Sequence, residues 1–270
     1  MIDAESLKVE NLLARPEKHL AWAHDYRTVD NDNFYEQAFD SIISLLGPPA
    51  GATFLDAGCG SCAHSVRLAQ RGFKVHGVDF SEPALEMARE KIRVRGLEDR
   101  ITLQRDSLLG LSFPDASFDY ALCWGVLMHV PQVELAVAEL ARVVRPGGSL
   151  IISEANQSSF EAFAFRNLKR LVRNRKAEMR STPAGLEYWV DGGSGALVTR
   201  EANISWLINK FDEHGLTVRK RFAGQFSEGY TRVSDARLKR LVHGFNDFWF
   251  RQVSWPTPAF GNILILQKRK

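Results

Sequence analysis

Residues 54–63 read FLDAGCGSCA, an apolar strand end that passes through one acidic residue into a glycine-rich turn and then into a helical pattern. Gly58 and Gly60 allow the backbone to turn sharply and to lie close to a ligand, because neither residue carries a Cβ atom. The helix that follows offers free N–H groups in its first turn. This stretch therefore predicts a site for a nucleotide-bearing cofactor.

Outward from this turn, short apolar runs alternate with segments of helical period, which is the pattern of βαβ units and a mostly parallel sheet. We expect strands at 52–56, 74–79, 101–106, 118–124, 149–153, 216–223 and 262–267. Helices are expected at 62–71, 81–96 and 131–144, and again around 204–211 and 238–249. Thr199 is the expected N-cap of the helix around 204–211. The fold class is thus α/β, a doubly wound, Rossmann-like sheet.

The regular alternation breaks after Ser153, and residues 154–198 form a long excursion without a clear sheet pattern. A segment of this length is usually functional, so we expect a lid or a substrate-recognition element. We predict one domain in four parts: an N-terminal helical cap over 1–50, a cofactor-binding core over 51–153, the insertion over 154–198, and the rest of the sheet with a further helical insertion over 199–270.

The composition is that of a globular enzyme-sized chain, with 270 residues of which 45% are hydrophobic. No early apolar run resembles a signal peptide, and no stretch approaches the roughly 18 uncharged residues that would span a bilayer. We therefore expect a soluble, cytoplasmic protein. Its three cysteines fit a reducing compartment. Cys59 and Cys62 form a C-x-x-C without a second pair at zinc spacing, so no metal is expected.

The net charge of +3 is unevenly distributed, because residues 166–180 hold seven Lys or Arg and one Glu. The rest of the chain is slightly acidic. This basic segment is either a solvated helix face or a surface for an anionic membrane or a phosphorylated substrate. Nucleic acid is not expected as a partner, since the sequence contains no recognition module.

Two acidic residues flank the turn. Asp79 lies at the end of the second expected strand, where a carboxylate can accept hydrogen bonds from both hydroxyls of a ribose, or else can cap the helix that begins after Ser81. Asp56 precedes the turn, where enzymes that bind a dinucleotide normally have an apolar residue. A carboxylate there suits the amino-acid end of a compact ligand better than a pyrophosphate. GCGSCA still matches G-x-G-x-x-A, so an NAD-dependent oxidoreductase stays an alternative.

Four motifs in order extend the comparison: LDAGCG, VDFSEPALEMAR, RDSLLGLSFPDASFDYALCWGVLMHV and RPGGSLIIS. With them, residues 54–153 resemble class I S-adenosylmethionine-dependent methyltransferases, in particular the small-molecule branch of ubiquinone and menaquinone biosynthesis. The resemblance implies seven strands with the last antiparallel, S-adenosylmethionine as cofactor and S-adenosylhomocysteine as by-product. The third glycine that is common in the first motif is Cys62 here.

The resemblance also implies roles for individual residues. Contacts to the methionine moiety would come from Asp56, Gly58, Cys59 and Gly60, with Tyr26 near its carboxylate. The ribose would be held by Asp79, and the adenine by Phe80, Asp106 and the N–H of Ser107. Trp124 and Gly125 would border the sulfonium and the substrate entrance. For Phe80 and Trp124 the alternative is core packing, and for Asp106 it is a turn cap.

His129, just beyond the fourth expected strand, is the candidate general base, because its pKa suits neutral pH. The alternative is a histidine that only packs within its loop. The expected reaction is methyl transfer to a small-molecule acceptor, at oxygen. Two alternatives are N- or C-methylation of a phosphorylated, lipid-linked or glycan acceptor, and a non-catalytic protein that binds S-adenosylmethionine. C-terminal aromatic residues favour an apolar or aromatic acceptor if they line a pocket. The sequence indicates no oligomeric state.

Overall fold

The main sheet has seven strands in a computed structural model that describes residues 2–26, 28–171, 178–193 and 195–270, without the side chains of 23–26 and 168–171. The strands are β1 (Thr53–Ala57), β2 (Lys74–Asp79), β3 (Ile101–Arg105), β4 (Phe118–Trp124), β5 (Val144–Ala155), β9 (Leu216–Ala223) and β10 (Gly261–Lys268). Their order is β3-β2-β1-β4-β5-β10-β9. The first five pair in parallel, and β10 is antiparallel to both of its neighbours. The predicted doubly wound sheet with an antiparallel last strand is confirmed.

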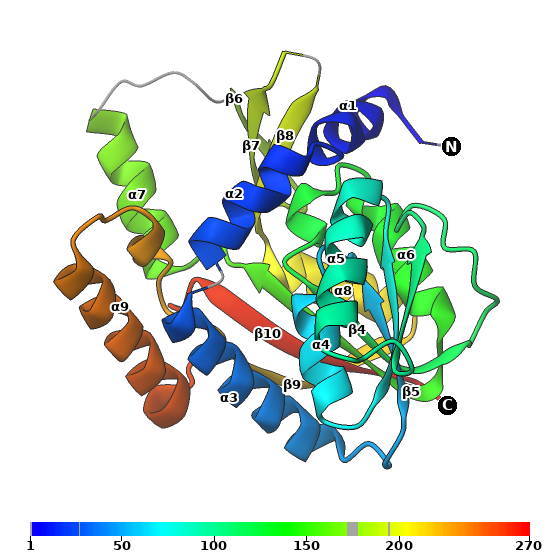
Figure 1. Ribbon diagram of the computed structural model, residues 1–270. Helices are drawn as coiled ribbons and strands as arrows, with labels where there is room; N and C mark the ends of the chain where they lie inside the picture. The colour runs from blue at the N-terminus through cyan, green and yellow to red at the C-terminus, as the bar shows by residue number, and fades with distance from the viewer. Residues whose placement is uncertain (1, 27, 172–177, 194) are drawn as a thin grey trace.

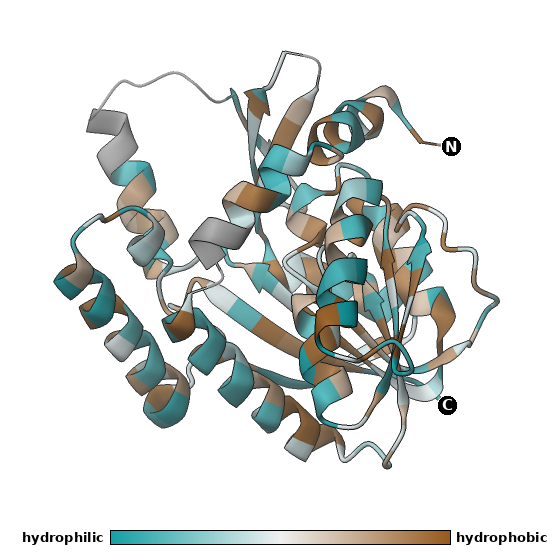
Figure 2. Ribbon diagram, viewed as in Figure 1, coloured by the Kyte–Doolittle hydropathy of each residue, from teal (hydrophilic) through white to brown (hydrophobic). Residues whose placement is uncertain are grey.

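Helices cover both faces of this sheet (Figure 1). One face carries α3 (Val29–Leu46), α4 (Ala63–Gln70) and α5 (Glu82–Val94), and the other carries α6 (Val133–Val143) and α8 (Ile204–Glu213). Strand β10 shows why both faces are apolar: Ile263 and Ile265 pack on the α3 side, whereas Leu264 and Leu266 pack on the α6 side. In Figure 2 hydrophobic positions accordingly run along the strands, while the helices show both colours.

A second sheet is formed by the insertion after β5. It consists of β6 (Glu178–Thr182), β7 (Gly185–Asp191) and β8 (Ala196–Ala202), all antiparallel, and it follows α7 (Phe160–Leu171). The expectation of a segment without sheet character was wrong. The reason is chemical, because two of the inward positions carry charged residues, Glu187 on β7 and Arg200 on β8, and these interrupt the apolar alternation that marks a strand.

Helix α8 begins at Ile204, and its N-cap is Asn203, whose Oδ1 accepts the N–H of Trp206 at 3.2 Å. Thr199 lies inside β8, so its prediction as the cap was wrong. Between β9 and β10 the chain forms a 3-10 turn (Gly229–Thr231), α9 (Ala236–Phe248) and a π-helical turn (Trp249–Val253). The helical addition expected before the last strand is therefore present.

The N-terminal helices close the carboxyl end of the sheet. Helices α1 (Ala4–Leu13) and α2 (Pro16–Tyr26) lie across this end beside β7 and β8 (Figure 1). Val9 and Leu13 of α1 pack on Trp189 of β7 and Val198 of β8. The cap and the inserted sheet thus share an apolar contact over the strand ends. None of the helices in the described residues is long and apolar enough to cross a membrane.

Replacing Asn203 tests the start of α8. We expect Asn203→Ala to lower the free energy of unfolding by about 1 kcal/mol, because the N–H of Trp206 loses its acceptor. Urea unfolding monitored by circular dichroism measures the change. Asn203→Asp keeps a carboxylate oxygen in the same position and should retain most of the stability. Equal losses in both variants would show that the cap does not contribute.

Candidate functional site

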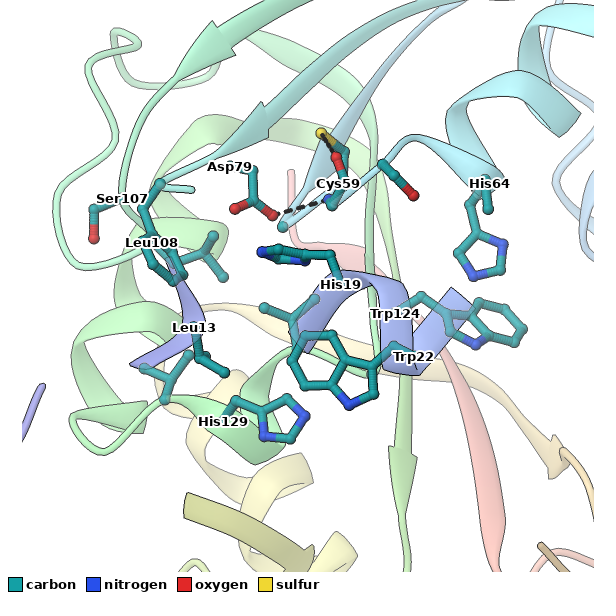
Figure 3. Close-up of a pocket in the computed structure, with 18 of the residues that line it drawn as sticks. Leu13, His19, Trp22, Cys59, His64, Asp79, Ser107, Leu108, Trp124 and His129 are labelled. Carbon is teal, nitrogen blue, oxygen red and sulfur yellow. Dashed lines mark hydrogen bonds between the residues drawn. The ribbon is translucent and has the colours of Figure 1, made fainter. Parts of the chain in front are cut away.

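A cavity of about 260 Å³ opens at the carboxyl ends of β1, β2 and β4, beneath α1 and α2 (Figure 3). Many of the residues predicted for the site line it: Gly58, Cys59, Gly60, Asp79, Phe80, Ser107, Trp124, Gly125 and His129. We call it the first cavity. Segments far apart in the sequence meet there because parallel strands end at the same edge of the sheet.

The turn after β1 uses its glycines in two different ways. Gly58 has φ +78°, and a Cβ atom there would lie 2.6 Å from both methyl groups of Val126. Gly60 has φ +53°, and a Cβ atom there would have no heavy atom within 4 Å, in a residue that lines the cavity. Packing therefore demands the first glycine, and the second leaves room for a ligand. Cys62, at the third position of the motif, also has a left-handed φ of +61° and is fully buried. This conformation explains the usual preference for glycine there.

Asp79 joins the turn to the end of β2. Its Oδ2 accepts the N–H of Gly60 and its Oδ1 accepts the N–H of Ser81, both at 2.9 Å. Burial raises the pKa of Asp79. The N-cap of α5 is Ser81, whose hydroxyl accepts the N–H of Ala84, so Asp79 is not itself the cap. Asp79 fixes this N-cap residue and lines the cavity, and its contact with a ribose stays a prediction. Each oxygen keeps a lone pair that can accept another hydrogen bond.

Asp56 does not line the cavity, in contrast to its expected contact with a methionine moiety. It is buried beneath the turn, where its Oδ2 accepts the hydroxyl of Ser65 at 2.5 Å. Burial raises the pKa of Asp56 to about 6, and the nearby charge of Asp79 adds to this. The residue therefore fixes the start of α4 from below. From the position of Asp56 in the motif alone, one cannot tell whether its side chain supports the turn or contacts a ligand.

Asp106 also lies outside the cavity lining. Its Oδ1 accepts the N–H of Ser107 at 2.9 Å, and its Oδ2 accepts the N–H and the hydroxyl of Ser112 at 2.9 and 2.8 Å. Asp106 is thus the turn cap of the alternative interpretation, and it engages the very N–H that Ser107 was expected to offer to a ligand. Glu10 of α1 lines the cavity beside Ser107 instead, and burial raises its pKa.

The opposite end of the cavity is charged and aromatic. Arg67 of α4 lines it, buried and paired with Asp32 and Glu36, and its guanidinium lies 5.0 Å from the ring centre of Tyr35. Burial raises the pKa of the Tyr35 hydroxyl. Tyr26, the predicted tyrosine, ends α2, and its side chain lies outside the described part. Tyr35 carries the same composition signal, and no motif distinguished the two.

Six of the lining residues that were not predicted come from the N-terminal helices: Ser6, Val9, Glu10 and Leu13 of α1, and His19 and Trp22 of α2. His19 Nε2 lies 2.9 Å from the hydroxyl of Ser81 and so ties α2 to the end of β2. These residues have no fixed spacing from the motifs.

His129 ends the 3-10 turn η1 (Leu127–His129) that follows β4. Its Nδ1 lies 2.7 Å from the carbonyl oxygen of Val198, so Nδ1 must carry the proton and Nε2 keeps its lone pair. The ring stacks on Trp22 at 5.2 Å between centres. Burial lowers the pKa of His129 below 6.5. The imidazole is therefore neutral at pH 7, with one nitrogen able to accept a proton.

Two buried charged residues hold the turn that carries His129. Glu154 at the end of β5 accepts the N–H groups of Leu127 and Met128 at 2.9 and 3.1 Å. Arg200 of β8 donates to the carbonyl oxygens of Leu127 and Val130 at 2.8 and 3.0 Å, and it pairs with Glu187 at 2.7 Å. The main sheet thus fixes the N–H groups of the turn and the inserted sheet fixes its carbonyls.

A second cavity of about 310 Å³ adjoins the first. The two share Trp22, Tyr35, His64, Trp124, Gly125 and His129. The remaining wall of the second cavity consists of Phe34, Met128, Ser153, Glu154, Ala155, Leu197, Thr199, Gly224, Gln225, Glu228, Phe260 and Gly261. The predicted pair of Trp124 and Gly125 therefore stands where one chamber passes into the other.

Removing Arg200 tests the support of the His129 turn. Because the side chain is only 2% exposed, we expect Arg200→Met to lower the free energy of unfolding by about 3–5 kcal/mol, since the charge of Glu187 is left buried and unpaired. The double variant Arg200→Met/Glu187→Met should recover part of this loss. Urea unfolding measures both.

Arg166→Met provides a matched control, because Arg166 pairs with Glu201 at a similar distance, 2.8 Å, but its side chain is more exposed. This substitution should lower the free energy of unfolding by about 1 kcal/mol or less. Similar losses for Arg166→Met and Arg200→Met would contradict a special role of the buried pair.

Comparison with known proteins supports the resemblance that the sequence motifs indicated for the cofactor-binding core, residues 51–153. A family model described as a methyltransferase domain matches residues 55–152. A demethylmenaquinone methyltransferase from Geobacillus stearothermophilus is 36% identical over 56% of this chain and 58% of its own length. A ubiquinone biosynthesis O-methyltransferase from Azoarcus sp. is 38% identical over 43% of this chain and 49% of its own. The chain thus spans about half the length of these curated relatives.

The fold extends further than the sequence similarity. The PH0226 protein from Pyrococcus horikoshii OT3 superposes with a TM-score of 0.62 at 17% identity, over 91% of this chain and 94% of its own. The resemblance predicted from the motifs is confirmed over the segment that carries them. The methyltransferase-domain model thus matches the same segment, residues 55–152, that carries the motifs.

Proposed function

We propose that the whole chain is a methyltransferase that transfers a methyl group from S-adenosylmethionine to a small molecule. One observation carries the proposal: two adjoining cavities share a boundary at Trp124, Gly125 and His129. The first cavity, at the glycine turn, would hold the cofactor, and the second would hold the acceptor. Sequence motifs that are typical of the cofactor surround the first cavity, whereas the second is lined by residues from all four parts of the chain, half of them from 1–50 and 199–270.

The residues of the first cavity fit the three parts of S-adenosylmethionine. Asp79 has lone pairs for the ribose hydroxyls, and the open space above Gly60 admits the methionine chain. Phe80 and the other apolar lining residues Val9, Leu13 and Leu108 suit the adenine, and the carboxyl of Glu10 would take the role expected for Asp106. Arg67 and Tyr35 suit the methionine carboxylate at the opposite end.

When bound, the cofactor supplies a methyl group on an activated sulfonium leaving group, so the protein mainly has to position the reactants. Orientation of two reactants can contribute about 7–11 kcal/mol, whereas a general base contributes about 10² to 10⁴ in rate. We assign the base to His129, which would take the acceptor proton at Nε2 because Val198 fixes the proton on Nδ1. The acceptor atom that best fits a base is an oxygen.

The same proposal assigns a part to each region of the chain. Residues 1–50 cap the cofactor, 51–153 bind it, 154–198 supply part of the acceptor wall and the support of His129, and 199–270 complete the sheet and that wall. Leu197, Thr199 and Phe260 in the second cavity support the last two assignments.

Affinity for S-adenosylhomocysteine tests the cofactor site. We expect calorimetry to detect binding to the wild-type protein, and Asp79→Ala to weaken it about ten- to a hundredfold, since a hydrogen bond to a charged group contributes about 1.5–3 kcal/mol. The exposed Asp99→Ala is the control and should bind as the wild type does. Thermal stabilisation by NAD instead of S-adenosylhomocysteine would favour the oxidoreductase alternative.

Substitution of His129 tests catalysis separately from binding. His129→Asn should retain affinity for S-adenosylhomocysteine and lose about 10² or more in turnover of an oxygen acceptor, because no group takes the proton. The pKa of His129 is lowered in the folded state, so wild-type activity should persist at pH 6.5 and fall only as the pH drops further. Full turnover by His129→Asn would show that His129 only packs within its loop. Binding of S-adenosylhomocysteine without any turnover by the wild-type protein would favour the non-catalytic alternative.

A further inference from the structure

Helix α9, at the edge of the molecule, exposes large hydrophobic side chains to solvent (Figure 1). Four of them, Leu238, Leu241, Phe245 and Phe248, are spaced three or four residues apart and therefore lie on one side of the helix. Leu241 is 68% exposed and Phe248 is 52% exposed. Trp255 follows the π-helical turn, is 59% exposed, and accepts at its carbonyl the indole N–H of Trp249. We call the four helix residues and Trp255 the α9 surface.

The other side of α9 packs on the body of the protein. Asn246 is buried, and it accepts the N–H of Ser227 at 3.0 Å and donates to the carbonyl of the same residue at 2.8 Å. Phe226 packs against Phe245 and Trp249, with ring centres 5.0 and 4.6 Å apart. The helix is thus fixed in an orientation that turns Leu241 and Phe248 outward, and within the described residues no segment covers them.

Basic residues border the α9 surface. Residues 229–255 hold five Lys or Arg and two Asp, a net charge of +3. Arg237 lies one helical turn before Leu241, and Arg240 lies one turn after Arg237, so both follow the edge of the apolar side. Both are exposed and form no ion pair with any described residue, whereas Arg232 and Arg251 are paired with carboxylates.

The carboxylates nearest to this edge do not neutralise it. Arg240 lines a groove between α9 and α3 that also contains Asp30, Glu36 and Asp247. Glu36 is paired with arginines of α4 and the residue after it, and Asp247 is paired with Arg251. Asp30 is exposed and forms no ion pair with Arg240. The guanidinium groups of Arg237 and Arg240 are therefore available to an anionic partner.

The basic segment 166–180, which the sequence offered as a membrane or phosphate surface, gives no such evidence in its described residues. Arg166 pairs with Glu201 and donates to the carbonyl of Gln157, and Arg180 pairs with Glu5 and Glu178. The side chains of 168–171 and residues 172–177 lie outside the described part. Exposed basic residues without an ion pair are found beside the α9 surface instead.

The combination of these features indicates the kind of partner. Contiguous exposed apolar side chains mark an interaction site. A helix with Leu, Phe and Trp on one side and Arg along its edge is typical of helices that lie in the interface of an anionic bilayer. Lipid headgroups and acyl chains can surround such a helix at the edge of a protein, and a Trp ring suits the boundary between them.

We propose that α9 docks onto an anionic lipid surface, with Leu241, Phe248 and Trp255 buried among the lipids and Arg237 and Arg240 bound to headgroup phosphates. Arginine suits this contact because its planar guanidinium can donate two parallel hydrogen bonds to one phosphate. The inference goes beyond the proposed function and does not depend on it, because neither the cofactor nor an acceptor takes part.

Sedimentation of the full chain with lipid vesicles tests the docking. One set of vesicles contains phosphatidylcholine alone, and the other contains equal parts of phosphatidylcholine and phosphatidylglycerol. We expect the wild-type protein to bind the anionic vesicles about tenfold or more tightly than the neutral ones, with a preference that falls as salt is added. Arg237→Gln/Arg240→Gln should remove most of this preference and leave binding to the neutral vesicles unchanged.

The apolar contribution is tested by Leu241→Gln/Phe248→Gln, which keeps good helix formers in α9. This variant should bind both kinds of vesicle about tenfold or more weakly, because the two apolar side chains no longer leave water. Two controls alter exposed residues elsewhere and should bind as the wild type does: Leu135→Gln on α6, and Arg95→Gln/Arg219→Gln after α5 and on β9. Circular dichroism establishes that every variant is folded.

Three results would overturn the proposal. The first is a wild-type protein that does not sediment with the anionic vesicles. The second is binding that the α9 variants leave unchanged or that the controls weaken equally. The third is a dimer of the wild-type protein that sedimentation velocity detects and that Leu241→Gln/Phe248→Gln dissociates, since the α9 surface would then be covered by a second copy of the chain.

Discussion

The constraint on which the site depends is the left-handed backbone of the turn after β1. Gly58 cannot carry a side chain because a Cβ atom there would collide with Val126, and at Gly60 the missing side chain leaves open space in the cavity. Hydrogen bonds fix it from two sides: Val78 accepts the N–H groups of Gly58 and Cys59 at 2.8 and 2.9 Å, and Asp79 accepts that of Gly60. The end of β2 therefore determines the geometry of the turn and at the same time presents a carboxylate to the cavity. One strand end serves both purposes.

The inserted sheet is a structural support of the catalytic candidate as well as a cover. Val198 sets the tautomer of His129, and two residues further along β8 Arg200 holds the carbonyls of the same turn. The first contact is a backbone carbonyl on the edge strand of the inserted sheet and the second is a side chain, so a single strand supplies both. Burial of the charged side chains of Arg200 and Glu187 costs desolvation free energy unless every donor and acceptor has a partner. Loss of one partner should therefore destabilise the fold of this region. The insertion thereby links the cap, the turn and the wall of the second cavity.

The two cavities differ in how closely sequence determines them. Residues of the first cavity follow the motifs in order, because parallel strands deliver their ends to one edge and the spacing along the chain fixes what stands there. Asp56 and Asp106 show the limit of that rule. Each is a carboxylate at a strand end, yet Ser65 and Ser112 engage them, and only the local hydrogen bonds decide whether such a residue faces a ligand or supports a turn. Glu10 shows the converse, a site residue on a helix with no motif.

By itself, the sequence determined the α/β sheet and brought Gly58, Gly60 and Asp79 to one edge of it, since these depend on local periodicity and on spacing within βαβ units. The antiparallel last strand and the expected cofactor class followed only from the resemblance of the motifs to a known family. The tertiary structure decided the rest. The strands of the insertion were hidden because Glu187 and Arg200 occupy inward positions, and their pairing is visible only across β7 and β8. The wall of the second cavity joins the end of β5 to the loop after β9, over 70 residues away in sequence. Long-range contacts of this kind leave no periodic signal in the chain.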